Sequence, residues 1–268
     1  MNEFPQVLTI AGSDSDGSAG LQADLHTFFI RKTYGMSVLV AAVAGNSYGI
    51  HASETLPLAF IEKQFDVLSD DFKIRASKTG MLSDATLIKT VVQAYQKYDF
   101  GPLVVDPVIT TKHGAQLLVD SAFQALKGLL LPLAEVATPN FFEAQLLTGV
   151  TISSEADQRE AAKAIQSLGV KNVVVKGWHN QTDQSEVADY VLLADGSDFW
   201  LRHRYFDTTH INGTGDTLSA TIAAELAKGE TVEQAIRVGH EVTTTAIENE
   251  IAVGHQFGPI NHWAAAKI

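Results

Sequence analysis

Short apolar runs alternate with longer segments of helical periodicity along most of this 268-residue chain. A strand–helix rhythm of this kind predicts an α/β fold, in which a mostly parallel sheet carries helices on both faces. The runs that have the length of buried strands are 7–11, 38–44, 73–78, 103–105, 135–137 and 172–175. The helical patterns are 19–32, 56–68, 84–98, 115–130, a stretch from about Phe141, 154–167, 214–228 and 232–248.

Residues 189–205 depart from this rhythm. Two apolar segments there flank Asp195 and Gly196, which is a strong signal of a β-hairpin. Hydrophobic residues make up 46% of the chain, enough for a sizeable core, and no repeat or linker divides the sequence. We therefore expect one domain over residues 1–268.

The overall charge limits the partners of this protein. Lys and Arg number 19 against 31 Asp and Glu, a net charge of −12, which opposes binding to nucleic acid or anionic lipid by bulk charge. The absence of cysteine excludes disulfides and thiolate metal sites. The first residues lack a signal-peptide pattern, and no apolar run is long enough to span a bilayer. We expect a soluble cytoplasmic protein without nucleic-acid or membrane partners.

The stretch HINGTGDTLSA (210–220) is the strongest candidate for chemistry. A glycine-rich turn at a helix start leaves backbone N–H groups free to bind an anion. Asp216 stands in the first turn, where a carboxylate also stabilises the helix dipole. Alternatively, Asp216 is a general base that takes the proton of an attacking hydroxyl while the N–H groups hold a transferring phosphoryl group.

Other polar residues follow the predicted strands, at the edge where ligands bind in α/β sheets. Asp106 could hold a magnesium ion through water, or simply break the strand. Lys176 could reach a nucleotide phosphate, or be a solvated lysine at a strand end. Asn140 and Glu143 fit either a helix capping box or a pair that orders water around magnesium.

The glycine-rich stretch AGSDSDGSAGLQADL (11–25) also follows a strand and precedes a helix. It matches neither the dinucleotide fingerprint nor the phosphate-loop pattern. Asp14 and Asp16 make it a poor phosphate cradle, so it suits a neutral or cationic small molecule better.

Six blocks of the sequence, taken in order, resemble one enzyme family. The blocks are TIAGSDSDGSAGLQADLHTF, KTGML, VVDPV, TPNFFEAQLLTG, VVVKG and NGTGDTLSATIAAELAKG. They are similar to the vitamin-kinase branch of the ribokinase superfamily, which contains pyridoxal kinases and hydroxymethylpyrimidine (phosphate) kinases. The resemblance implies a ribokinase-like three-layer sandwich with the hairpin near the nucleotide. It also implies ATP, Mg2+, a hydroxymethyl-bearing vitamin ring as substrate, and a homodimer.

The resemblance further implies roles for individual residues. Asp216 matches the catalytic base, with Gly213 and Gly215 in the anion hole. The residues that match the substrate pocket are Ser13, Asp24, Asn46, Met81 and Val108. Those that match the ATP side are Asp106, Asn140, Glu143, Lys176 and Thr214, and of these Glu143 and Asp106 are expected to bind Mg2+ through water.

Two departures from the pyrimidine kinases favour pyridoxal as the acceptor. Those enzymes typically carry Cys where this chain has Asp216, and Gln where it has Gly45, which offers no amide to a pyrimidine edge. We therefore predict an ATP-dependent pyridoxal kinase that phosphorylates the 5′-hydroxymethyl of a B6 vitamer. One alternative is a hydroxymethylpyrimidine/phosphomethylpyrimidine kinase of thiamine biosynthesis. The other is a non-catalytic vitamin-binding regulator, which we expect to lack the base or the anion hole.

Overall fold

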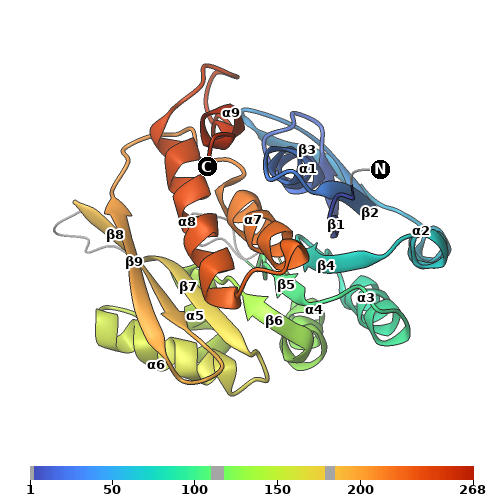
Figure 1. Cartoon of the computed structure of the whole chain (residues 1–268), viewed down its shortest axis with the longest axis horizontal. Helices are drawn as coiled ribbons and strands as arrows, with labels where there is room; N and C mark the ends of the chain where they lie inside the picture. Colours follow the sequence, from blue (N-terminus) through green and yellow to red (C-terminus); the bar gives the residue numbers. More distant parts are fainter. Residues whose placement is uncertain (1–2, 110–117, 179–184) are drawn as a thin grey trace.

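The computed structural model describes residues 3–109, 118–178 and 185–268. Strands in that part of the chain form one sheet with the order β3-β2-β1-β4-β5-β6-β7-β8-β9 (Figure 1). The strands are β1 (Gln6–Asp14), β2 (Tyr34–Asn46), β3 (Gly49–Thr55), β4 (Ile74–Thr79), β5 (Leu103–Val105), β6 (Ala134–Ala137), β7 (Asn172–Trp178), β8 (Glu186–Leu192) and β9 (Asp198–Arg204). Strands β2, β1, β4, β5, β6 and β7 run parallel to one another, whereas β3, β8 and β9 pair antiparallel with their neighbours.

The central strands are buried on both faces. Successive side chains of a strand point to opposite faces of its sheet. On β5, Val104 joins one apolar cluster while Leu103 and Val105 join the other. The strands therefore read in the sequence as short continuous apolar runs rather than as alternating patterns, as expected for a covered parallel sheet.

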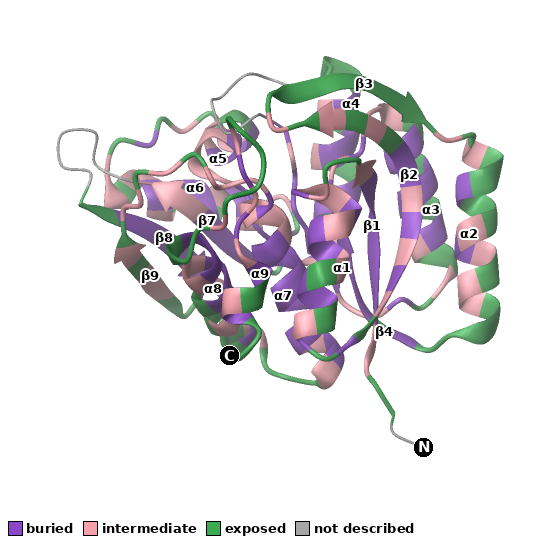
Figure 2. Cartoon of the chain, turned by 90° about the horizontal axis from the view of Figure 1, so that it is seen from above, coloured by how far each residue is buried: buried purple, intermediate pink, exposed green. Residues whose placement is uncertain are grey.

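Helices cover the two faces of this sheet. The helices are α1 (Gly20–Ile30), α2 (Leu58–Asp71), α3 (Ala85–Lys97), α4 (Asp120–Ala125), α5 (Phe141–Thr148), α6 (Glu155–Gln166), α7 (Thr214–Lys228), α8 (Val232–Glu248) and α9 (His262–Ala265). Phe28 of α1, Ile222 of α7 and Ile236 of α8 pack with Val104 on one face. Helices α2 to α6 pack on the opposite face, and the purple sheet lies between the two layers in Figure 2. The predicted α/β class is confirmed.

Local sequence explains where several helices begin. The Asp84 carboxylate accepts hydrogen bonds from two backbone N–H groups in the first turn of α3 and so caps this helix. The Ser154 hydroxyl caps α6 in the same way. Pro57 immediately precedes α2, where its missing N–H costs nothing.

Two features of the sheet and its helices differ from the sequence prediction. The antiparallel edge strand β3 was not expected, and all seven of its residues are exposed, as the green colour in Figure 2 shows. The helix expected over 115–130 is shorter: α4 gives way to a π-helical turn (Leu126–Leu130) and a 3₁₀ turn (Leu131–Leu133). Residues 115–117 of that prediction lie outside the described residues. The hairpin predicted at 189–205 is present as β8 and β9.

The parallel arrangement brings several candidate residues to one edge of the sheet. The carboxyl ends of β1, β4, β5, β6 and β7 lie along the same edge because these strands are parallel. The segment from β9 returns to that edge before α7 begins, next to the loop between β1 and α1. None of the helices in the described ranges has the length and hydropathy needed to cross a lipid bilayer.

Candidate active site

The start of α7 depends on two glycines. Gly213 is the residue before the helix and has φ of 83°, the left-handed conformation that favours glycine. A Cβ on Gly213 would lie only 2.3 Å from the carbonyl oxygen of Ser18, so the loop after β1 packs directly against this turn. The N–H groups of the first helical turn have no acceptors within the helix and can bind an anion.

Gly215 allows two charged side chains to approach the same turn. A Cβ on Gly215 would lie 3.1 Å from Asp106 Oδ2 and 3.4 Å from Lys176 Nζ. Thr214, between the two glycines, turns its hydroxyl back to donate to the Ile211 carbonyl at 2.7 Å. The Thr214 N–H lies 3.3 Å from the same carbonyl oxygen, so both donors of Thr214 face Ile211.

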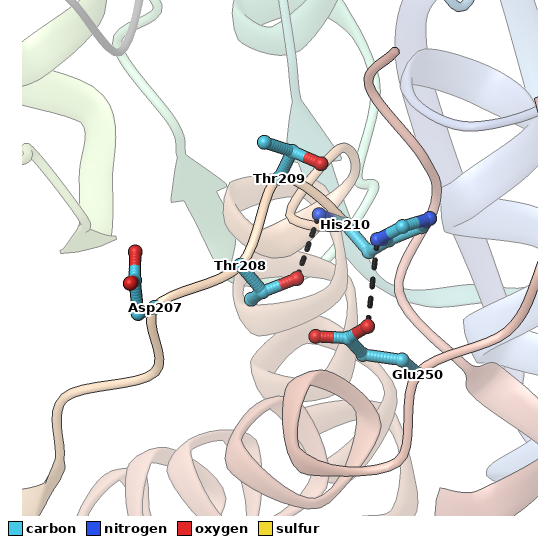
Figure 3. Close-up of a pocket in the computed structure, with 5 residues that line it drawn as sticks. All are labelled: Asp207, Thr208, Thr209, His210 and Glu250. Carbon is cyan, nitrogen blue, oxygen red and sulfur yellow. Dashed lines mark hydrogen bonds and ion pairs between the residues drawn. The ribbon is translucent and has the colours of Figure 1, made fainter. Parts of the chain in front are cut away.

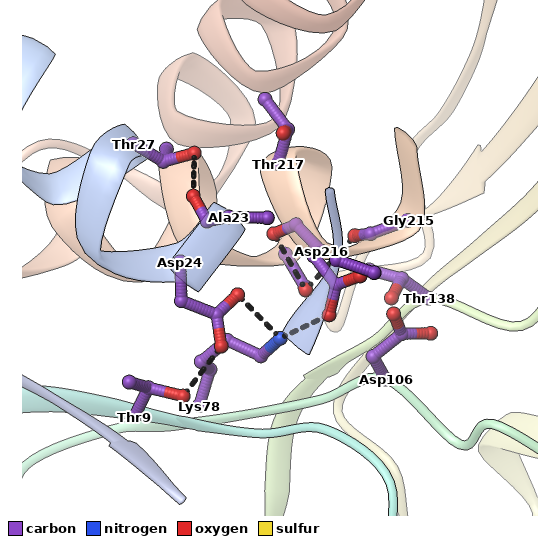
Figure 4. Close-up of polar contacts among 12 residues, drawn as sticks. Thr9, Ala23, Asp24, Thr27, Lys78, Asp106, Thr138, Gly215, Asp216 and Thr217 are labelled. Carbon is purple, nitrogen blue, oxygen red and sulfur yellow. Dashed lines mark hydrogen bonds and ion pairs between the residues drawn. The ribbon is translucent and has the colours of Figure 1, made fainter. Parts of the chain in front are cut away.

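Asp106 and Lys176 form an ion pair beside the helix start. Lys176 Nζ lies 3.2 Å from Asp106 Oδ1 and donates to the Thr138 carbonyl at 2.5 Å. Both side chains are mostly buried, because β5, β6 and β7 end side by side here. The Thr138 hydroxyl is buried and has no hydrogen-bond partner among the described residues. Figure 4 shows Asp106 and Thr138 beside Gly215 and Asp216.

Asn140 and Glu143 form the capping box of α5. The Asn140 side chain accepts from the Glu143 N–H at 2.9 Å, and Glu143 Oε2 accepts from the Asn140 N–H at 2.9 Å. The other oxygen of Glu143 accepts from the Ile109 N–H at 3.0 Å. Burial raises the pKa of Glu143 to about 7; Lys176 opposes this shift and Asp106 adds to it. The charges of Lys176 and Asp106 therefore both act on the Glu143 carboxyl group.

Asp216 belongs to a line of buried charges. Lys78, at the end of β4, places its Nζ 3.3 Å from Asp216 Oδ1 and 2.8 Å from Asp24 Oδ1. Asp24 Oδ2 accepts from the Thr9 hydroxyl at 2.6 Å, as Figure 4 shows. The side chains of Lys78 and Asp24 are fully buried, whereas that of Asp216 is 19% exposed. Asp216 is thus the member of this line that can meet a substrate.

Three of the residues expected around the substrate ring lie at the ends of β1 and β2 or beside them. Ser13, near the end of β1, accepts a hydrogen bond from Gln22 at 2.8 Å. The methyl group of Met81 lies 3.6 Å from the position of a Cβ on Gly12, so Met81 covers the end of β1. Asn46 lies farther out, as the last residue of β2, where its side chain accepts a hydrogen bond from the Tyr48 N–H.

Val108 stands out among these residues because of its backbone. Its φ of 42° is a conformation that a β-branched residue rarely adopts. Such strain costs about 1–3 kcal/mol and tends to occur where a site needs a fixed geometry. Val108 follows Asp106 and Pro107 directly, so the strained turn lies beside the Asp106–Lys176 pair.

Sequence reasoning gave no role to Lys78 or Thr9, although it named Asp24 and Asp216, which Lys78 connects. The KTGML block was noted for its resemblance, but its lysine received no role. A lysine inside a run of otherwise buried strand residues was the available signal, because an ammonium group is rarely buried without a partner. Asp24, expected to touch substrate, instead uses both carboxylate oxygens for Lys78 and Thr9.

A hollow lies on the segment that leads into α7. It has a volume of about 330 Å³ and is lined by Asp207, Thr208, Thr209, His210 and Glu250. Figure 3 shows the His210 ring turned toward Glu250, and His210 Nδ1 lies 3.6 Å from Glu250 Oε2. Of these residues, only His210 belongs to the stretch 210–220 that the sequence singled out. The described residues hold no cluster of three or more His, Cys, Asp or Glu side chains able to bind a metal directly.

The chain is similar to known kinases over nearly its whole length. A family model described as phosphomethylpyrimidine kinase matches residues 14–261. The chain is 45% identical to hydroxymethylpyrimidine/phosphomethylpyrimidine kinase of Haemophilus influenzae, with 100% of both chains covered. It is 41% identical to the Bacillus subtilis protein of the same name, with 97% of this chain and 95% of that protein covered. The solved ADP complex of Bacillus subtilis pyridoxal kinase is 34% identical, with a TM-score of 0.89 and 98% of each chain covered.

The prediction of a pyridoxal kinase is wrong. Four relatives that are 41–45% identical share the pyrimidine-kinase name, which was the alternative, whereas pyridoxal kinases enter only among less identical solved structures. Asp216 was weak evidence for the acceptor, because a base meets the hydroxymethyl group that both kinds of ring carry. Gly45 was weak evidence too: its N–H and C=O groups both bond the Ser15 hydroxyl, so its backbone has a structural role.

The coarser expectations are confirmed. The fold and the order of the motifs match a kinase of the vitamin-kinase branch with a ribokinase-like architecture. The family model, over residues 14–261, covers β2 to β9 and α7. The chain belongs to the phosphomethylpyrimidine kinase family.

Proposed function

We propose that this protein transfers the γ-phosphoryl group of ATP to the hydroxymethyl group of a hydroxymethylpyrimidine. The observation that carries this proposal is the carboxylate of Asp216 inside the anion-binding turn at the start of α7. The choice of a pyrimidine acceptor rests on the names of the relatives. The ADP complex of a structural neighbour supports a nucleotide in the same fold.

The geometry supports a direct transfer. Asp216 takes the proton of the acceptor hydroxyl, and the oxygen forms a bond to the γ-phosphorus as the bond from that phosphorus to the β,γ-bridging oxygen breaks. ADP leaves with the electron pair of that bond. The N–H groups between Gly213 and Asp216 stabilise the negative charge on the transferring group. We propose Gly213, Gly215 and Asp216 as the catalytic residues.

The ATP side is proposed to be the ends of β5 to β7. Lys176 already faces a carboxylate and is the cation nearest to Gly215, so it is suited to a phosphate oxygen. Asn140 and Glu143 keep the start of α5 in place beside it. Thr214 contributes through its place in the anion-binding turn.

Magnesium fits the same region. Asp106 and Glu143 are carboxylates whose negative charges interact, and a hard divalent cation prefers such oxygen donors. Both oxygens of Glu143 are held by backbone N–H groups, so contact through water suits it better than direct coordination. When bound, magnesium neutralises phosphate charge and aligns the phosphates.

The acceptor ring is proposed to lie at the ends of β1, β2 and β4. Ser13 and Asn46 offer hydrogen-bonding groups, and Met81 and Val108 offer apolar surface. Asp24 is fully buried and paired with Lys78, so it is proposed to act through Lys78 and not by touching the ring.

We further propose that residues 1–268 work as one domain and that two copies form a homodimer. The single sheet supports the first point. The second is supported by β3, which is an edge strand of the sheet in the described part of the chain and whose Ile50 is 69% exposed. Light scattering of the protein after size exclusion, compared with Ile50→Asp, tests the pairing; two monomeric samples reject it.

A competition assay tests the proposed reaction. The protein receives ATP, Mg2+ and equal amounts of hydroxymethylpyrimidine and pyridoxal, and the phosphorylated products are separated and counted. We expect the pyrimidine monophosphate to dominate. Pyridoxal 5′-phosphate as the main product rejects the proposed acceptor, and no product from either ring favours a non-catalytic binding protein. A second incubation with phosphomethylpyrimidine measures whether a phosphate is also an acceptor.

A further inference from the structure

Lys78 is a buried cation for which the proposed reaction has so far given no role. It lies near the carboxyl end of β4, and its side chain has no exposed surface. Removing an ammonium group from water costs several kcal/mol unless charged partners compensate for the lost hydration. The fold brings two carboxylates to it, from α1 and from α7, so the placement is specific.

The contacts form a fixed chain across four elements. The Thr9 hydroxyl of β1 holds one oxygen of Asp24, and the other oxygen of Asp24 holds Lys78 Nζ at 2.8 Å. Lys78 Nζ then lies 3.3 Å from Asp216 Oδ1. A Cβ on Gly80 would lie 3.5 Å from Lys78 Nζ and 3.9 Å from Asp216 Oδ1, so Gly80 lies directly beside this contact.

We propose that Lys78 is a positioning residue for the phosphoryl transfer: its ammonium group orients the Asp216 carboxylate and supplies its counter-charge, while Asp24 and Thr9 hold Lys78. The inference rests on the proposed role of Asp216 as the base. It does not depend on which ring carries the hydroxyl.

The charges around Asp216 explain why two carboxylates share one lysine. Asp216 faces Lys78 from β4, with Asp24 of α1 behind it and the Asp106–Lys176 pair on the side of β5 and β7. When Asp216 accepts the proton of the hydroxyl, its negative charge disappears. Lys78 then still has Asp24 as its partner, so no unpaired charge is left in the interior.

The electrostatics agree with this arrangement. Burial disfavours the charged form of Lys78, but Asp24, Asp216 and Asp106 outweigh it and raise the pKa of the lysine. Burial raises the pKa of Asp24 to about 7, against the attraction of Lys78. Lys78 therefore remains an ammonium ion throughout the pH range in which a kinase is assayed.

A first experiment separates positioning from simple stability. Lys78→Met removes the charge at similar length, and Arg31→Met is its matched control because Arg31 forms another buried ion pair with Glu225, at 2.7 Å. We expect Lys78→Met to lower kcat by roughly 10²–10⁴-fold, as for loss of an effective base, with KM for both substrates within about threefold. Arg31→Met should lower the Tm while folded enzyme keeps its kcat. Equal kcat losses in the two variants would indicate a structural role and overturn the proposal.

A second experiment restores the charge chemically. The chain has no cysteine, so Lys78→Cys introduces a single thiol. After alkylation in denaturant and refolding, 2-bromoethylamine gives a side chain that ends in an ammonium group, whereas 1-bromopropane gives a neutral one of the same length. Wild-type protein taken through the same steps measures the refolded fraction. We expect the aminoethyl form to recover at least tenfold more kcat than the propyl form.

The outcomes distinguish this inference from the proposed function. Equal kcat in the aminoethyl and propyl forms, at equal folded fraction by circular dichroism, rejects the positioning role. If neither form refolds, the Lys78→Met and Arg31→Met comparison decides. If wild-type protein phosphorylates pyridoxal and not the pyrimidine, the proposed acceptor fails, and the same variants are measured with pyridoxal.

Discussion

Asp216 meets two physical requirements with one side chain. Its charge suits the positive end of α7, and its exposed oxygen can accept a proton from a bound hydroxyl. A residue that served only the helix would be replaceable by a neutral group at a loss of about 0.3–1 kcal/mol. A base would not be replaceable without loss of rate.

The Asp216→Asn variant separates these two roles. Asparagine keeps the size and the hydrogen bonds but cannot act as the base, so we predict that kcat falls by roughly 10²–10⁴-fold. Affinity for ATP, measured by titration calorimetry, should change little. Glu233→Gln is the control, since Glu233 is an exposed first-turn carboxylate of α8 with no proposed role. Wild-type turnover by Asp216→Asn would reject the base.

Gly213 and Gly229 bracket the same helix and give a matched pair of substitutions. Both have positive φ, 83° and 95°, but only Gly213 has an atom in the way, the Ser18 carbonyl at 2.3 Å from a Cβ. Alanine in the left-handed conformation costs about 1–2 kcal/mol. We predict that Gly229→Ala loses about that much free energy of unfolding and that Gly213→Ala loses clearly more, measured in urea. Equal losses would show that the loop after β1 yields freely.

At the scale of elements, α9 is fixed to α7 by an uncharged histidine. His262 Nε2 lies 2.9 Å from the Thr217 hydroxyl, and the ring of His26 on α1 lies 5.5 Å away. Burial lowers the pKa of His262 to about 4, and His26 adds to this shift. The unfolded histidine binds its proton near pH 6.5, whereas the folded one binds it near pH 4. The stabilisation by His262 is therefore complete above pH 6.5 and lost as the pH falls toward 4.

The lowered pKa of His262 predicts that the free energy of unfolding depends on pH, and that His262→Gln removes this contribution. At about 1.4 kcal/mol per pKa unit, the lowered pKa of His262 contributes at most ~3 kcal/mol to the free energy of unfolding. We predict that wild-type protein loses more free energy of unfolding between pH 6.5 and 4 than His262→Gln does. His51→Gln, at an exposed site, should follow the wild type. Asp24 and Glu143 titrate with the opposite sign, but they are common to all three proteins and cancel in the differences. Parallel curves for all three would refute the role of His262.

The elements also show what local sequence can predict. Buried strands and capped helices are visible because burial and capping leave marks within a few residues, as at β5 and at Asp84 of α3. Strand β3 leaves no such mark: its sequence GIHASET is fully exposed, and pairing with β2 alone makes it a strand. The turns after α4 were invisible for a related reason, since the apolar spacing of a π-turn is close to that of an α-helix.

At the scale of the whole molecule, the sheet determines which residues meet. Asp106, Lys176 and Asp216 are far apart in sequence, yet β5, β7 and α7 bring them to one edge. The places of Asp106 and Lys176 at strand ends were predictable from the sequence because parallel strands end together. The bridge from Lys78 to Asp24 and Asp216 was not predictable, because it depends on how β4, α1 and α7 are placed against one another in the fold. Lys78 and Lys176 thus place two cations at this edge, in a protein whose net charge of −12 opposes the approach of anions by bulk charge.

One sheet shared by all layers predicts one unfolding event. The three tryptophans report on separate parts: Trp178 at the end of β7, Trp200 in β9 and Trp263 in α9. Two variants keep either Trp200 or Trp263 as the single tryptophan, with the others changed to Phe. In each variant we expect the tryptophan fluorescence and the circular dichroism to give the same urea midpoint. Two separated midpoints within one variant would indicate that the hairpin or the C-terminal part unfolds as its own unit.

The carboxylate at position 216 has a consequence for how the protein responds to oxidants. A base made from a thiol is lost to peroxide or to alkylating reagents, whereas a carboxylate reacts with neither under mild conditions. With no cysteine in the chain, Met81 is the oxidisable side chain proposed to lie at the site. We predict that turnover survives N-ethylmaleimide unchanged, and that any loss in dilute peroxide appears as a raised KM for the acceptor and is abolished by Met81→Leu. The protein would then keep its kcat in a cell under oxidative stress.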